Sequence, residues 1–166
     1  MSDFSAILSP INVSQIVTSY LTEDIPAAFD VGGFVVGAQP ITANLYMKQS
    51  GVFAGKAFFD AVFTALGCTV TWSTAAAPTD SLRSDGGNFA TEEAVEGHEY
   101  TYAGTPICLA VVEGPCNQIL RGERTALCIL SRCSGVATDA RELTNIAVDA
   151  GWKGRVAGTR KVSRRE

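Results

Sequence analysis

Histidine is almost missing from this sequence of 166 residues, in which His98 is the only one. The cysteines are also poorly placed for chemistry, because no two of them form a Cys-x-x-Cys pair. A zinc site or a catalytic Cys/His pair needs such a cluster, so the sequence carries a signature for neither. An odd and scattered set of cysteines is typical of reduced thiols. They are Cys68, Cys108, Cys116, Cys128 and Cys133.

Long apolar runs are missing as well. No run reaches the roughly 18 residues that a membrane-spanning helix needs. The first five residues carry no basic segment ahead of an apolar one, which argues against a secretory signal. We therefore expect a cytoplasmic protein with no membrane partner.

An excess of positive charge is the third feature that the sequence lacks. Its formal net charge is -4, which argues against nucleic acid as the main partner. The C-terminal end is nevertheless locally basic, because six basic residues and one acidic residue occupy positions 153–166. With 46% hydrophobic and 18% charged residues, the composition is typical of a globular protein and excludes a disordered or fibrous one.

The stretch 114–138 predicts one long helix, which begins at a Gly-Pro pair and ends at the Ser-Gly pair 134–135. A step of about 100° per residue places five apolar side chains on one arc. Glu123 falls in the middle of that arc, where a buried carboxylate would need a cation or several backbone donors. Arg124 lies at the edge of the arc. The apolar arc consists of Ile119, Leu120, Ala126, Leu127 and Leu130.

The rest of the chain combines helices and strands. Helical spacing predicts a helix over 13–21 and another over 58–66, where an aromatic stripe is more typical of a core than of a cofactor pocket. A further helix is expected at 143–150, closed by Gly151. The segment 73–93 has no periodicity, which predicts a flexible insertion. Extended segments are expected at 34–36, 43–48, 52–54, 68–72, 99–103 and 106–113.

Residues 51–56 look like a phosphate-binding loop only at first sight. Their glycines, Gly51 and Gly55, are separated by three residues where four are needed. Ala57 stands where a serine or threonine would hold magnesium. We therefore predict a turn that leads into the start of a helix.

These elements predict an α+β N-terminal domain, a sandwich in which a mixed sheet is packed by helices. We place this domain at residues 1–138. Residues 155–158 predict one more strand, with Thr159, Arg160 and Lys161 at its C-terminal end. In an α/β barrel, that end of a strand lies on the face where functional residues collect.

Two motifs carry a resemblance to a known family. Residues 123–138 read Glu-Arg-Thr-Ala-Leu-Cys-Ile-Leu-Ser-Arg-Cys-Ser-Gly-Val-Ala-Thr, and residues 157–161 read Ala-Gly-Thr-Arg-Lys. In this order they closely resemble the paired signatures of quinolinate phosphoribosyltransferase, which is also called carboxylating nicotinate-nucleotide pyrophosphorylase. The resemblance includes shorter segments near the N-terminus and covers nearly the whole chain.

The resemblance implies a transferase of NAD biosynthesis. Enzymes of this family join quinolinate to phosphoribosyl pyrophosphate, and the products are nicotinate mononucleotide, pyrophosphate and carbon dioxide. The ribosyl carbon passes through an oxocarbenium-like state, so positioning and charge matter more than a protein nucleophile. Mg2+ arrives with phosphoribosyl pyrophosphate. We expect this chain to contribute neither a metal ligand nor a catalytic nucleophile.

The same resemblance assigns substrate-binding residues. Arg160 and Lys161 match the family's Arg-Lys pair, which binds quinolinate and the phosphoribosyl group, and Thr159 is a further candidate beside them. Arg124 matches the arginine that a neighbouring subunit lends across the dimer, so a homodimer or a higher homo-oligomer is expected. A guanidinium can meet a carboxylate or a phosphate through two parallel hydrogen bonds, which suits substrates of this charge.

The sequence departs from the family in two places. Cys128 stands where the family usually has asparagine, which removes an amide near Arg124. After Lys161 the chain continues over 162–166 without the family's Thr-x-Pro-Gly. Residues 139–166 would then hold only a helix and the first strand of an incomplete α/β barrel, which takes roughly 250 residues when complete. The ligands of Mg2+ would lie in the missing part.

Three interpretations stay open. The first is a quinolinate phosphoribosyltransferase that is inactive by itself because most of its barrel is missing. The second is a non-catalytic assembly partner, which pairs with full-length subunits and offers Arg124 to their sites. The third is a relative that acts on nicotinate, which arguments from charge do not separate from quinolinate.

Overall fold

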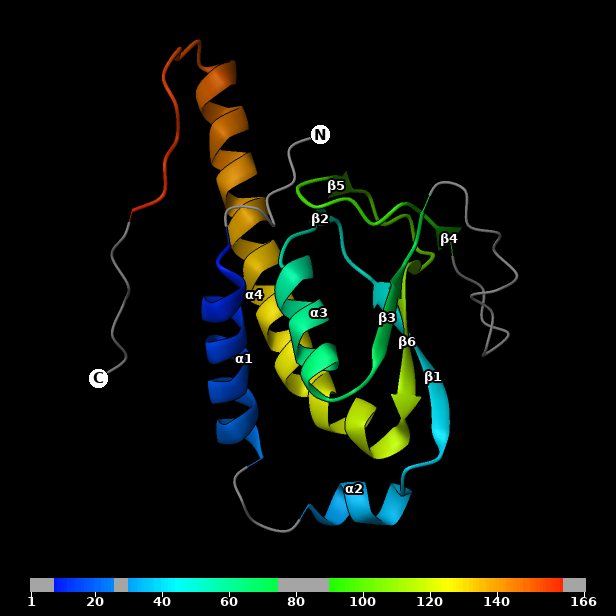
Figure 1. Ribbon diagram of the computed structural model, residues 1–166. Helices are drawn as coiled ribbons and strands as arrows, with labels where there is room; N and C mark the ends of the chain where they lie inside the picture. Colours follow the sequence, from blue (N-terminus) through cyan, green and yellow to red (C-terminus); the bar gives the residue numbers. More distant parts are fainter. Residues whose placement is uncertain (1–7, 26–29, 75–89, 160–166) are drawn as a thin grey trace.

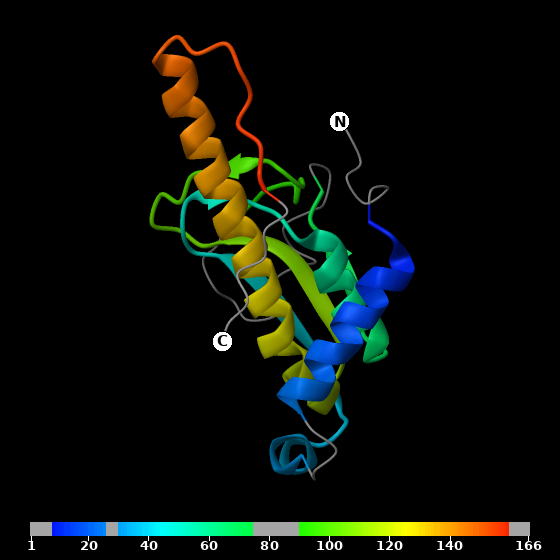
Figure 2. The ribbon, with the colours of Figure 1, turned by 90° about the vertical axis from the view of Figure 1, so that its left-hand side faces the viewer.

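The structure is a computed structural model that describes residues 8–25, 30–74 and 90–159. Figures 1 and 2 show its helices and strands from two sides. Within the described ranges, no helix is both long enough and apolar enough to cross a membrane.

A four-stranded sheet forms one layer of the fold (Figure 1). Its central strand is β6 (Ile107–Pro115), which is antiparallel to β1 (Pro40–Met47) on one side and to β3 (Thr69–Trp72) on the other. β4 (Ala90–Thr91) pairs in parallel with the start of β6. Residues 107–112 are all buried, so both faces of the central strand are covered.

Four helices are found in the described residues. α3 (Lys56–Ala65) and the first half of α4 (Cys116–Asp149) pack against each other and against the sheet. α1 (Pro10–Asp24) packs on these two helices from the side away from the sheet (Figure 1). α2 (Val31–Val36) lies against the start of α4. The layers are therefore sheet, α3 with α4, and α1.

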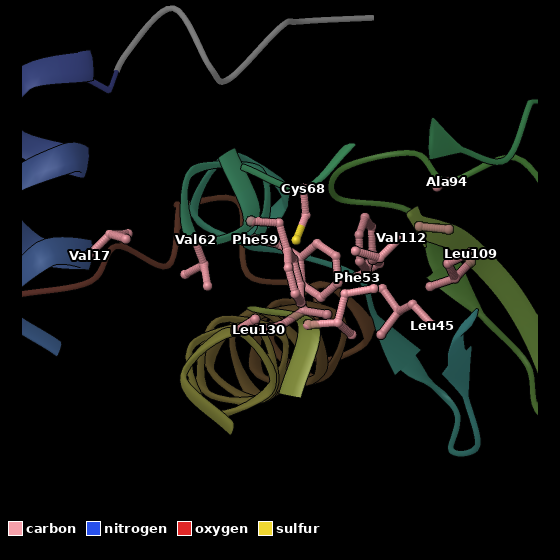
Figure 3. Close-up of a cluster of buried hydrophobic side chains, with 14 of the residues drawn as sticks. Val17, Leu45, Phe53, Phe59, Val62, Cys68, Ala94, Leu109, Val112 and Leu130 are labelled. Atoms are coloured by element: carbon pink, nitrogen blue, oxygen red, sulfur yellow. The ribbon is translucent and has the colours of Figure 1, made fainter. Parts of the chain in front are cut away.

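Aromatic side chains fill the core between α3 and the sheet. Phe53 and Phe59 lie in the cluster shown in Figure 3. The ring centroid of Phe59 is 4.9 Å from that of Phe63 and 5.4 Å from that of Trp72. This arrangement confirms that the aromatic stripe of the 58–66 segment belongs to the core.

A small second sheet ties the loops to α4. It consists of β2 (Gly51–Val52) and β5 (Glu99–Tyr100), which are antiparallel. The backbone N–H of Val52 donates to Oγ1 of Thr138 at 2.9 Å. The Ser134 hydroxyl bonds both the N–H and the C=O of Ala54, each at 3.1 Å. These bonds fix the middle of α4 against the edge of the domain.

The start of α3 confirms the predicted turn and helix start. Gly55 has a φ of 107° there, a conformation that favours glycine. The Glu96 carboxylate accepts from the backbone N–H groups of Gly55 at 2.8 Å and of Lys56 at 3.1 Å. Two donors that a phosphate would need are therefore already used by the protein's own carboxylate.

The expected α+β architecture is confirmed. The predicted helices at 13–21 and 58–66 correspond to α1 and α3, and the predicted strand at 106–113 to the central strand β6. The extended segments expected at 68–72 and 99–103 contain the strands β3 and β5, and those expected at 43–48 and 52–54 overlap β1 and β2.

The strand expected at 34–36 is wrong, because these residues belong to α2. Asp30 precedes the helix, and its Oδ1 accepts a hydrogen bond from the backbone N–H of Gly33 at 2.9 Å. Gly37, at a φ of 72°, ends the helix. The apolar triplet 34–36 favours a strand by propensity. The N-cap at Asp30 and the C-cap at Gly37 instead stabilise a short helix between them.

The helix end expected at 134–135 is also wrong. α4 continues without a break to Asp149, so the helix expected at 143–150 is its C-terminal part, and Gly151 follows at a φ of 78°. Ser134 does not act as a stop because its hydroxyl binds Ala54 across the domain. The second half of α4 projects beyond the other elements (Figures 1 and 2). Our domain division after residue 138 stays a prediction, and α4 runs across it.

No strand is present at 155–158. Residues 152–159 are irregular and exposed, and no strand of the described part pairs with them. A strand needs a neighbour for its backbone N–H and C=O groups, so the segment has no reason to become regular here. The first strand of a barrel is therefore not formed in this structure.

The flexible insertion expected at 73–93 lies mostly outside the described residues, but its two ends belong to the sheet. Ser73 is buried, and its backbone N–H donates to the carbonyl of Leu109 at 2.9 Å. At the other end, Ala90 and Thr91 form β4. The described ends of the segment are therefore bonded to the sheet, and the expected flexibility of the rest stays a prediction.

Asp60 is a carboxyl whose ionisation should affect stability. Burial raises its pKa above 3.8, although a 2.7 Å hydrogen bond from Nε1 of Trp72 and the charge of Lys56 act in the opposite direction. A carboxyl with a raised pKa in the folded state stabilises the fold at low pH, and this contribution is lost as the pH rises through the folded pKa.

Asp60→Asn keeps an acceptor for Trp72 but cannot ionise. We therefore expect the free energy of unfolding of the variant to rise relative to that of the unmodified chain as the pH increases above about 4, the ordinary pKa of an aspartate. Urea denaturation at a series of pH values measures this difference, and Asp139→Asn at an exposed position is the matched control. Parallel pH profiles for Asp60→Asn and the unmodified chain would contradict the prediction.

Candidate functional site

Arg124 lies on the outer face of α4, and its side chain is 78% exposed. Its Nη1 donates to Oδ1 of Asp24 at 3.3 Å. Asp24 is the last residue of α1 and is separated from Arg124 by 100 positions in the sequence. The guanidinium is thus held at one nitrogen while most of its surface faces solvent.

Thr125, the next residue of α4, is buried and binds the same carboxylate. Its Oγ1 lies 3.5 Å from Oδ2 of Asp24. Each oxygen of the Asp24 carboxylate therefore has a donor from a consecutive pair of residues on α4. Of these three residues, the sequence pointed only to Arg124.

The buried face of α4 differs from the predicted arc. Ile119, Ala126 and Leu130 are buried as expected. Leu120 and Leu127 are 44% and 38% exposed, however, and the buried face includes Gly122 and Thr125 instead. The helix is therefore rotated about its axis relative to our expectation.

This rotation removes the expected problem at Glu123. The residue is exposed, so it needs no buried cation, and our prediction of one was wrong. The cause is Gly122, where an added Cβ would come within 2.8 Å of Leu66 Cδ1 and 3.0 Å of Phe63 Cε1 on or next to α3. Only a residue without a side chain lets α3 approach α4 this closely, and its position turns Glu123 outward.

Two hollows meet at Arg124. One, of about 740 Å³, lies between α1, α3 and α4 and is lined in part by Tyr20, Phe58 and Arg132. The other, of about 640 Å³, lies towards α2. Asp24, Arg124 and Cys128 line both. An anionic group that enters from solvent would meet the guanidinium at either hollow.

The thiols of this region are not arranged for nucleophilic chemistry. Cys128, which replaces the family's usual asparagine, is exposed and lines both hollows. Burial and then the charge of Glu96 raise the pKa of Cys133, which keeps this thiol protonated and a weak nucleophile. The charged side chains that line the two hollows include guanidiniums, such as that of Arg124, and carboxylates, such as that of Asp24.

The C-terminal candidates are placed only in part. Thr159 is exposed at the end of the irregular segment that follows α4. Arg160 and Lys161 lie outside the described residues, so their roles stay predictions. Among the residues that are described, no group of three or more His, Cys, Asp or Glu side chains could hold a metal ion. The expectation about Mg2+ therefore stays a prediction.

The sequence of this chain matches a known protein family over most of its length. Residues 17–134 match the family described as "Quinolinate phosphoribosyl transferase, N-terminal domain". The chain belongs to this family. The matched range includes Asp24, Arg124 and Thr125, and it ends within α4.

Relatives of known name extend the match over nearly the whole chain. It is 38% identical to the human and 36% identical to the rat "Nicotinate-nucleotide pyrophosphorylase [carboxylating]", in each case over 95% of this chain. The protein of the same name from Dictyostelium discoideum is 37% identical over 97% of this chain. The chain spans 44%, 51% and 45% of the rat, Dictyostelium and human proteins, which is about half their length.

Solved structures agree in fold. The nicotinate-nucleotide pyrophosphorylase from Francisella tularensis superposes with a TM-score of 0.65 over 86% of this chain and 43% of its own, at 19% identity. NadC from Streptococcus pyogenes superposes with a TM-score of 0.62 over 84% of this chain and 41% of its own, at 21% identity. At these identities the likeness supports the fold of the family.

Proposed function

We propose that this chain serves the quinolinate phosphoribosyltransferase reaction of NAD biosynthesis, in which quinolinate and phosphoribosyl pyrophosphate give nicotinate mononucleotide, pyrophosphate and carbon dioxide. Relatives that share 36–38% of its residues over nearly its whole length support this proposal through their names. The observation that carries it is Arg124, which the fold presents to solvent on a rigid helix with one nitrogen anchored.

The charge of the substrates explains why such an arginine is useful. Quinolinate carries two carboxylates, and phosphoribosyl pyrophosphate carries a phosphate and a pyrophosphate together with its Mg2+. A guanidinium has five N–H donors in a planar fork. Arg124 uses one nitrogen, Nη1, for its hydrogen bond to Asp24. The donors that remain can approach a carboxylate or phosphate in pairs.

Arg160 and Lys161, with Thr159 beside them, complete the proposed set of substrate-binding residues. In this proposal they bind quinolinate and the phosphoribosyl group, and Arg124 is offered to the site of a neighbouring subunit in a homodimer or higher homo-oligomer. Because the chain spans about half the length of its relatives, we expect it to show no turnover alone. Mg2+ enters as part of the substrate, and the described residues contribute no step through it.

Calorimetric titration of the chain with quinolinate tests the binding half of this proposal. We expect Arg160→Ala to raise the Kd at least about tenfold, because a charge-assisted bond to a carboxylate is lost. Arg155→Ala, at an exposed position outside the motif, should leave the Kd unchanged. A parallel titration with nicotinate, which has one carboxylate, separates a nicotinate-specific relative from the proposed function. Equal affinity of the chain and Arg160→Ala for quinolinate would count against it.

A non-catalytic assembly partner is the second candidate, and the projecting half of α4 favours it. This part carries exposed apolar side chains, which is unusual for a helix that is meant to face only water. A larger assembly would cover them. They are Val136, Leu143, Ile146 and Val148.

Complementation distinguishes this candidate and tests Arg124. The chain is mixed with the full-length human relative in which the arginine that matches Arg124 is replaced by alanine, and mass and turnover are measured. We expect a mixed assembly with restored turnover, and no restoration by Arg124→Ala. Arg141→Ala, which lies on the same helix, is exposed and lines neither hollow, should restore turnover like the unmodified chain. If the two proteins do not associate, the partner hypothesis fails.

A further inference from the structure

The carboxylate that holds Arg124 stands in an unfavourable place. Asp24 is the last residue of α1, which ends with two acidic residues and has no basic residue in its last turn. The C-terminal end of a helix carries partial negative charge, so an acidic side chain there is destabilising. Contacts with another element must therefore stabilise a carboxylate at this position.

The contacts of Asp24 supply that reason. Its side chain is 19% exposed and receives one donor on each oxygen, from Nη1 of Arg124 and from Oγ1 of Thr125. Thr125 is buried in the interface of α4, so it anchors the carboxylate from the protein side. Arg124 then meets an acceptor whose position is set before any substrate arrives.

We propose that Asp24 is a positioning residue, which orients the guanidinium of Arg124 for an anionic substrate group; the inference rests on the proposed function. A free arginine side chain samples many rotamers, which binding would have to restrict. With Nη1 bonded to Asp24, the protein restrains one nitrogen of the planar fork before a ligand arrives. Asp24 touches no reacting atom, and it acts through Arg124.

Glu23 offers a matched control at the same helix end. It is acidic, precedes Asp24 directly and lines the 740 Å³ hollow, but it is exposed, and its side chain makes no ion pair or hydrogen bond with another described residue. Glu23→Gln and Asp24→Asn remove the same charge from the same end of α1. A difference between the two variants therefore reports the bond to Arg124 and not the charge of the helix end.

The first measurement is made on the chain alone. Side-chain ¹⁵N relaxation at Nε reports the mobility of Arg124, with exposed Arg132 on the same helix as the reference. We expect Arg124 to be more ordered than Arg132 in the unmodified chain and in Glu23→Gln, and equally mobile in Asp24→Asn. Unchanged order of Arg124 in Asp24→Asn would overturn the inference.

The second measurement uses the mixed assembly with the human variant. We expect Asp24→Asn to raise the KM for quinolinate about tenfold, to leave the KM for phosphoribosyl pyrophosphate unchanged, and to keep kcat within about twofold. Asp24→Glu, which restores the carboxylate, should recover part of this loss, and Glu23→Gln, which removes a negative charge but no bond to Arg124, should not raise the KM for quinolinate. A purely structural defect would instead lower the amount of assembly and leave both KM values alone.

Arg124→Ala separates the two possible failures. If Arg124→Ala abolishes restoration while Asp24→Asn has the KM of the unmodified chain, the positioning role is overturned and the proposed function stands. If Arg124→Ala restores full turnover, the role of Arg124 in the proposed function is overturned, and the positioning role falls with it.

Discussion

Replacement of Phe59 by alanine is expected to lower the free energy of unfolding by about 3–5 kcal/mol. The side chain is 3% exposed and lies in the centre of the cluster between α3 and the sheet (Figure 3). Its ring contacts those of Phe63 and Trp72 in tilted and edge-on arrangements. Deletion of the ring removes these contacts and leaves a cavity in the core.

Urea denaturation followed by fluorescence and circular dichroism measures this change. Phe34→Ala on α2 is the control, because that ring is 73% exposed and its loss should change the free energy by no more than about 0.5 kcal/mol. Equal effects of the two substitutions would mean that the cluster is not the core of the domain.

Gly122→Val is expected to cost roughly 2–3 kcal/mol, at the upper end of what overpacking usually costs. The first carbon of the new side chain would already lie 2.8 Å from Leu66 Cδ1 and 3.0 Å from Phe63 Cε1. Phe63 is buried and cannot move freely, so α3 and α4 must separate. Separation would also disturb Arg124, which lies two residues further along α4.

Gly135→Val is the matched control on the same helix. No atom lies within 4 Å of the position that its Cβ would take, so we expect a change of no more than about 0.5 kcal/mol. Chemical denaturation of both variants gives the comparison. A stability of Gly122→Val equal to that of Gly135→Val would show that close approach of α3 does not set the rotation of α4.

The hydrophobic period of the sequence was informative wherever a helix packs along one face. It predicted α1 and α3 within a few residues, and it predicted the first half of α4. The ends of elements were less predictable. Ser134 and Gly135 look like a helix end, but the hydroxyl binds Ala54, which is 80 positions away in the sequence. Such a bond has no local signature.

In the candidate site, too, the sequence predicted what has a local signal and missed what depends on long-range contacts. The motif around Arg124 pointed to the residue, to its family and to the charge of its ligand. It did not point to Asp24, because the ion pair joins residues 100 positions apart and depends on the crossing of α1 and α4. Two acidic residues at the end of α1, where they oppose the helix dipole, were a signal that could have been used.

The sequence by itself determined the family and the α+β class, since these follow from its motifs and from the spacing of its apolar residues, and through the family resemblance it named Arg124 as a candidate. Tertiary structure decided which side of α4 faces the core, because the absence of a side chain at Gly122 acts only against Phe63 and Leu66 of another segment. It also decided that Arg124 has a fixed acceptor, because a carboxylate can orient a guanidinium only after the helices that carry them have packed.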